Sequence, residues 1–176
     1  MSMASCCNKN QVELNRYMLS DEEKQWVPYQ AGQDLTFEYS NGNELNFHVD
    51  KRETFMERMG GEHCGEGYIS YEKLEAEIYS DSPYMLFNLS MQAQEFSEHY
   101  LSIVFNSHQE FFQLDIDSAP DYASIDINGY TFENVYELES QQNNSTGIVP
   151  KIIFYNKTDG IIQIILTDDE TISLKK

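Results

Sequence analysis

The stretch that decides the fold is DLTFEYSNGNELNFHV, residues 34–49. Leu35, Phe37 and Tyr39 alternate with polar residues, and the same alternation resumes from Leu45 after the dipeptide Asn41-Gly42. Strict alternation is typical of a strand with one buried face, and Asn-Gly between two such runs is the strongest short signal for a β-hairpin. The stretch therefore predicts two antiparallel strands joined by a tight turn.

The same pattern continues to the end of the chain. Strand-like runs begin at Tyr84, Tyr100, Phe111, Ser124 and Lys151, and a second Asn-Gly turn falls at Asn128-Gly129. In YISYEKLEAEIY, residues 68–79, the apolar positions change phase, which predicts a β-bulge near Glu72 or else a short helix. We expect about ten strands with short connections, an all-β antiparallel meander that closes into a barrel or a strongly curved sheet.

One short helix precedes the strands, in LSDEEKQWVPY, residues 19–29. Ser20 and Glu23 have the spacing of a capping box, and Pro28 should end the helix. Residues 1–19 are polar and poor in strand signals, so we expect a flexible tether there, followed by a single domain at 20–176.

Composition excludes some functions. Eleven basic residues stand against thirty acidic ones, for a net charge of −19. A nucleic-acid-binding surface needs the opposite sign, and an anionic lipid surface should repel the folded body. No run approaches the roughly 20 apolar residues of a transmembrane helix. The acidity is that of a soluble surface.

The beginning of the chain indicates where the protein resides. Met3-Ala4-Ser5-Cys6 is similar to the end of a bacterial lipobox, so Cys6 is the candidate lipidation site. Several acyl chains would anchor the protein without any contact between polypeptide and membrane. Two residues before Met3 cannot form the apolar part of a signal peptide, so either the natural chain starts upstream of Met1 or the match is accidental. A disulfide between Cys7 and Cys64 is an alternative use of the other cysteines, but a tether offers it no fixed geometry.

Candidate metal ligands are scattered. His63 and Cys64 lie in the glycine-rich stretch MGGEHCGEGY, residues 59–68, without the second ligand pair of a zinc site. His48, His99 and His108 are isolated, and we expect them at the surface. Two acidic clusters offer oxygen ligands for calcium but lack the glycine and the closing glutamate of an EF-hand loop; they comprise Asp115, Asp117 and Asp121, and Asp168–Glu170. We therefore assign no metal, cofactor or catalytic residue.

Three stretches together resemble lipoproteins of the Bacteroidota to which no activity is assigned: LSDEEKQWVPYQAGQDLTFEYSNG at 19–42, INGYTFENVYEL at 127–138 and IIFYNKTDGIIQIIL at 152–166. The resemblance implies an all-β body, export and a lipid on Cys6, while residues 53–110 match nothing specific. CNKNQ after Cys6 lacks the acidic pair beside a lysine that is familiar as a surface-export signal in this group, so we expect the outer membrane, facing the periplasm.

The sequence therefore predicts a non-enzymatic, lipid-anchored envelope protein that binds a protein partner or a small apolar ligand. Two alternatives remain open. One is an envelope hydrolase that uses a carboxylate pair, which would need a cleft holding carboxyls of raised pKa. The other is a cytoplasmic acidic β protein whose lipobox is accidental.

Overall fold

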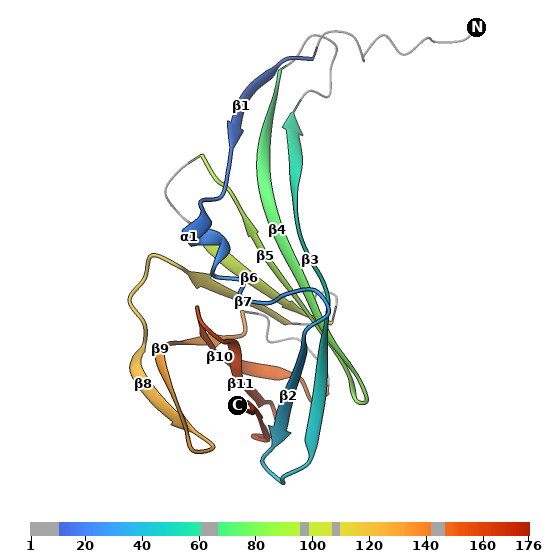
Figure 1. Ribbon diagram of the computed structural model, residues 1–176, viewed down its shortest axis with the longest axis vertical. Helices are drawn as coiled ribbons and strands as arrows, with labels where there is room; N and C mark the ends of the chain where they lie inside the picture. The colour runs from blue at the N-terminus through green and yellow to red at the C-terminus, as the bar shows by residue number, and fades with distance from the viewer. Residues whose placement is uncertain (1–10, 61–66, 96–98, 107–109, 142–146) are drawn as a thin grey trace, which may run out of the picture.

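A computed structural model describes residues 11–60, 67–95, 99–106, 110–141 and 147–176. It contains one helix, α1 (Asp21–Lys24), and twelve strands that form one curled sheet (Figure 1). The strands are β1 (Glu13–Tyr17), β2 (Asp34–Tyr39), β3 (Glu44–Gly60), β4 (Tyr68–Asp81), β5 (Tyr84–Gln92), β6 (Tyr100–Phe105), β7 (Glu110–Asp115), β8 (Tyr122–Ile127), β9 (Tyr130–Glu139), β10 (Pro150–Asn156), β11 (Gly160–Leu166) and β12 (Thr171–Leu174).

The sheet has the order β7-β6-β5-β4-β3-β2-β12-β11-β10-β9-β8, and every neighbouring pair in it is antiparallel. Its curl brings β7 against the end of β9, where the Gln141 amide donates to the Phe111 carbonyl at 2.9 Å. The prediction of an all-β antiparallel meander in a strongly curved sheet is confirmed, and the shape is that of a half-barrel. The hairpin of residues 34–49 forms as predicted, with Leu35 opposite Phe47 and Phe37 opposite Leu45.

The helix also forms as predicted, and its first turn carries the full capping box. The Ser20 hydroxyl accepts from the Glu23 amide, and the Glu23 carboxylate accepts from the Ser20 amide. α1 ends at Lys24, before Pro28, and Arg52 of β3 donates to the Lys24 and Val27 carbonyls just beyond it. These bonds satisfy backbone acceptors that a short helix leaves open.

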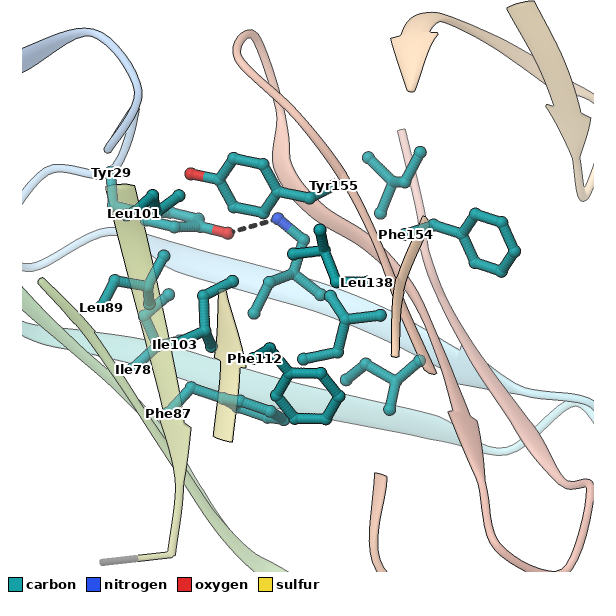
Figure 2. Close-up of a cluster of buried hydrophobic side chains, with 14 of the residues drawn as sticks. Tyr29, Ile78, Phe87, Leu89, Leu101, Ile103, Phe112, Leu138, Phe154 and Tyr155 are labelled. Carbon is teal, nitrogen blue, oxygen red and sulfur yellow. Dashed lines mark hydrogen bonds between the residues drawn. The ribbon is translucent and has the colours of Figure 1, made fainter. Parts of the chain in front are cut away.

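The half-barrel is filled by its own side chains. Strand after strand contributes alternate residues to one apolar cluster, which Figure 2 shows around Phe87, Phe112 and Tyr155. In the part of the interior between β2, β5 and β11 the hollow is only about 10 Å³. A void of that size is barely enough for one water molecule.

Two buried tyrosines fix the segment that follows α1 against the C-terminal strands. The Tyr29 hydroxyl accepts from the Ile161 amide at 2.6 Å, the bond drawn dashed in Figure 2. The Tyr155 hydroxyl donates to the Trp26 carbonyl. Burial raises the pKa of both phenols above their usual value, because the ionised form would lose its hydration.

The sequence-based prediction for residues 68–79 is wrong. β4 is one continuous strand from Tyr68 to Asp81, and its register with β3 is regular from Tyr68 to Glu77, so the predicted bulge or helix near Glu72 does not exist. The register shift lies in the partner strand, between Val49 and Lys51. The apolar phase of β4 changes because its first half extends beyond the body, where the opposite face of the strand is the apolar one.

The expected tether at 1–19 does not describe residues 13–17. They form β1, which lies parallel to β4 in an otherwise antiparallel sheet, with Tyr17 opposite Tyr71. The two rings stack at a centroid distance of 5.3 Å. A strand held by a long-range partner needs no strong local signal, which is why its polar sequence predicted a tether.

Candidate functional site

The most distinctive surface is a three-stranded projection of the sheet, which we call the arm (residues 12–18, 51–60 and 67–73). β1 and the adjoining ends of β3 and β4 extend beyond the other strands (Figure 1). Every residue of β3 from Glu53 to Gly60 is exposed. At the start of the same strand, from Glu44 to Val49, every second residue is buried instead. The β3 strand of the arm is therefore exposed on both faces.

Apolar side chains are concentrated on the arm. The described residues include nine large hydrophobic side chains that are exposed, and six of them belong to the arm: Val12, Leu14, Met18, Phe55, Met56 and Met59. Isolated exposed apolar residues are normal, but a cluster of them usually marks an interaction surface.

Most of these side chains lie on the outer face of the arm, opposite the face that continues into the core. In β4 the even-numbered residues from Ser70 to Ser80 are buried, so Ile69 and Tyr71 point outward. Met59 pairs with Ile69, and Phe55 pairs with Lys73 on that same face. Leu14 lies directly over Gly67, where any side chain would collide with it. The outer face thus carries most of the exposed apolar side chains of the arm, with Glu57 between Phe55 and Met59 and opposite Tyr71.

The inner face of the arm is polar and its charges are matched. Arg16 holds Glu13 through two bonds, at 3.0 and 2.9 Å, and this hydrogen bonding keeps the pKa of Glu13 below its usual value. The Arg58 guanidinium lies 4.7 Å from the centre of the Tyr68 ring. At the base of the arm the buried carboxylate of Glu72 accepts from the Leu19 amide and from Lys24. These contacts fix the direction in which the arm leaves the body.

Two adjoining hollows lie beside α1 and the turn between β10 and β11, with volumes of about 630 and 450 Å³. Their cations are already engaged: Lys24 binds Glu72, Arg52 binds backbone carbonyls, and Lys176 binds Asp159. Lys157 lies over the Trp26 ring and 3.6 Å from Glu22. Because each cation has a partner within the chain, the hollows define no particular ligand.

The candidate metal ligands are not brought together. Cys6, Cys7, His63, Cys64 and His108 lie outside the described residues. His48 pairs with Asp34 at 2.8 Å on the hairpin, and His99 lies 3.3 Å from Glu23 and 3.8 Å from Asp117. Within the described ranges no three histidine, cysteine or acidic side chains are grouped to hold a metal ion.

The acidic clusters serve as turn formers. The Asp115 carboxylate accepts from the Asp117 amide, and the Asp168 carboxylate accepts from the Glu170 amide. Asp121 accepts from the Glu137 amide, which fixes the chain beside β9. Each of these side chains therefore has a local structural role.

The carboxylates whose pKa values shift do so in the wrong direction for acid catalysis. Burial alone would raise the pKa of Glu75, but hydrogen bonds and attraction from Lys73 and Lys51 outweigh it and lower the pKa. The pKa of Glu13 is lowered as well. A glycoside hydrolase instead needs one carboxyl of raised pKa in a cleft.

Sequence reasoning missed the arm, although one signal was present. The change of apolar phase within residues 68–79 places Ile69 and Tyr71 on the face opposite Leu74 and Ala76. In a strand without a bulge, such a change means that different faces are apolar at the two ends.

No helix within the described ranges combines the length and the apolar character needed to cross a bilayer. Comparison with protein-family models, with curated proteins and with solved structures found no match to this chain.

Proposed function

We propose that this chain is a non-enzymatic envelope lipoprotein, anchored through Cys6 to the outer membrane on its periplasmic side, which binds a protein partner through the arm. The observation that carries the binding function is the concentration of exposed apolar side chains on the arm, six of the nine in the described residues. A protein partner would cover apolar surface that the fold leaves exposed to water.

The filled half-barrel favours a protein partner over a small apolar ligand. Carriers of apolar ligands hold them in a cavity that is typically 300 to 1,000 Å³. Here the apolar space between β2, β5 and β11 is about 10 Å³, and the two larger hollows are bordered by charged side chains. The arm offers a broad surface instead.

The position of Cys6 close to the arm also supports binding of a protein partner through the arm. The described chain begins next to the arm, because Val12 accepts from the Tyr68 amide and β1 follows directly. Four residues separate Cys6 from Gln11, and the five residue-to-residue steps between them span at most about 18 Å when extended. A lipid on Cys6 would therefore hold the arm near the membrane and the acidic body farther away.

Cys6→Ser should abolish lipid labelling in cells, whereas Cys7→Ser should leave it intact, because only Cys6 follows the Met3-Ala4-Ser5 sequence. The measurement is incorporation of an alkyne-tagged palmitate, detected on the purified protein after expression from the natural gene in its own host. Equal labelling of wild type and Cys6→Ser, or no label on either, would contradict the anchor and leave the cytoplasmic alternative.

A further inference from the structure

Among the described residues, one edge of β3 has no strand partner from Lys51 to Gly60. β2 pairs with β3 only from Glu44 to His48, and the bonds between Val49 and the segment at Gly32 and Gln33 end that contact. From Lys51 to Gly60, β3 pairs with β4 on one side, and on the other no described residue forms a backbone hydrogen bond with it. An exposed strand edge of this length is a template for another strand.

The bulge determines which backbone groups face this free edge. Val49 directs both its amide and its carbonyl toward the β2 side. Backbone direction alternates along a strand, and the extra residue between Val49 and Lys51 shifts the alternation by one. The amides and carbonyls of Arg52, Thr54, Met56 and Arg58 therefore point out of the free edge.

We propose that a second copy of this chain occupies this edge, so that the two β3 strands pair antiparallel around a two-fold axis with Met56 opposite Met56. The inference takes the arm as the binding surface, as in the proposed function, and names its partner. A two-fold axis perpendicular to the sheet keeps outward side chains on the outer face of both arms, as continuous strand pairing requires.

Charge excludes the neighbouring registers. An axis at Phe55 would place Arg52 opposite Arg58 and Glu53 opposite Glu57, two like-charge pairs that each occur twice. An axis at Glu57 or at Arg58 would place that side chain opposite its own copy. Like charges directly opposite one another destabilise a strand pair.

Occupied backbone excludes the next register on the other side. An axis at Thr54 would place the partner strand against Val49, whose amide and carbonyl already bond to Gln33 and Gly32. With the axis at Met56, the partner's strand ends at Arg52, where the free edge of β3 is still open. This register also contains no like-charge pair directly opposite: it sets Glu53 against Met59, Thr54 against Arg58, and Phe55 against Glu57.

The high net charge does not oppose this arrangement strongly. Antiparallel pairing of the arms places the two acidic bodies at opposite ends of the joined strands. In physiological salt the repulsion between charges falls off over about 8 Å, and Asp50, where the body begins on β3, lies six residues from the axis at Met56. At about 3.3 Å per residue, each body starts roughly 20 Å from the axis, well beyond the screening length.

The test is the mass of the full chain in solution with Cys6 replaced by serine, so that the lipid plays no part. Sedimentation equilibrium up to about 100 µM should show a concentration-dependent rise from 20.5 kDa toward twice that value. Met56→Lys should weaken the dimer at least about tenfold, because two lysines then meet on the axis. Within its own chain the new lysine faces Glu72, so the arm stays folded.

Three further variants test the register itself. Met59→Lys, the same exchange three residues along, should keep the dimer, because the partner's Glu53 lies opposite. Thr54→Glu should tighten it, because the partner's Arg58 lies opposite, and Thr54→Lys should loosen it. The proposal is overturned if the wild type stays at 20.5 kDa at every concentration, which would leave the edge to a different protein. It is also overturned if Met56→Lys and Met59→Lys weaken the dimer equally. Neither result bears on the Cys6 anchor, which the labelling experiment decides separately.

Discussion

Gly160→Ala is expected to lower the free energy of unfolding by about 4 kcal/mol, combining left-handed backbone strain of 1–2 kcal/mol with overpacking of 1–3 kcal/mol. Gly160 has a φ of +78°, which an alanine adopts with strain. A methyl group there would also overlap the buried hydroxyl and ring of Tyr29. The Tyr29 hydroxyl would have to move away from the Ile161 amide, and a buried donor would lose its partner.

Gly129→Ala is the matched control. Gly129 has nearly the same φ, +83°, but an added methyl group would have no atom within 4 Å. We expect it to show only the backbone strain, about 1–2 kcal/mol. The measurement is the urea midpoint and slope of both variants beside wild type. Equal losses in the two variants would show that Tyr29 does not pack on Gly160 as described.

Stability is expected to fall steeply above pH 10, and Tyr155 should contribute to that fall. The pKa of Tyr155 is raised in the folded chain, above the value of about 10 for a tyrosine exposed in the unfolded chain. Above pH 10 the unfolded state therefore releases a proton that the folded state keeps, so the unfolding free energy decreases with pH. The slope is about 1.4 kcal/mol per pH unit for each such tyrosine, until the folded pKa is reached.

Tyr155→Phe should reduce that slope by about 1.4 kcal/mol per pH unit, leaving the contribution of Tyr29, and should lower stability at pH 7 by about 1 kcal/mol, because the bond to the Trp26 carbonyl is lost. Tyr84→Phe, at a side chain that is 61% exposed, should change neither quantity. Urea unfolding of the three proteins from pH 7 to pH 11 makes the comparison. An unchanged slope in Tyr155→Phe would contradict the burial of this phenol.

The parts of the fold that the sequence predicts are those set by neighbours along the chain. Asn41-Gly42 and the alternation on both sides of it define the first hairpin, and Ser20 with Glu23 defines the start of α1. Each of these signals depends on residues within a few positions of one another, where turn and cap chemistry act.

The features that escaped prediction depend on residues far apart in the chain. Nothing near Glu13 indicates that it will lie beside Tyr68, and nothing near Tyr29 indicates that its hydroxyl will reach Ile161. The arm was missed for the same reason, because its three strands come from two distant parts of the sequence. Its one local sign, the change of phase in β4, was interpreted as a bulge, because the prediction assumed that every apolar face of a strand is buried.

The arm also explains why the scattered histidines and acidic clusters carry no function in this account. His48 and Asp168 lie on the body, where their partners are side chains or amides of the same turn or hairpin. Exposed apolar surface, by contrast, is concentrated on the arm. A protein that binds through such a surface needs no catalytic group, which agrees with the proposed role as a tethered binding protein.

The central claim, that the free edge of β3 is where this chain binds, is tested most directly by amide hydrogen exchange in the full chain at low and high protein concentration. The amides of Arg52, Thr54, Met56 and Arg58 should exchange quickly in dilute protein and become protected as concentration rises, while Phe55 and Glu57, which face β4, change little. Protection that appears instead around the hollows beside α1, with these four amides equally fast at every concentration, would contradict the account.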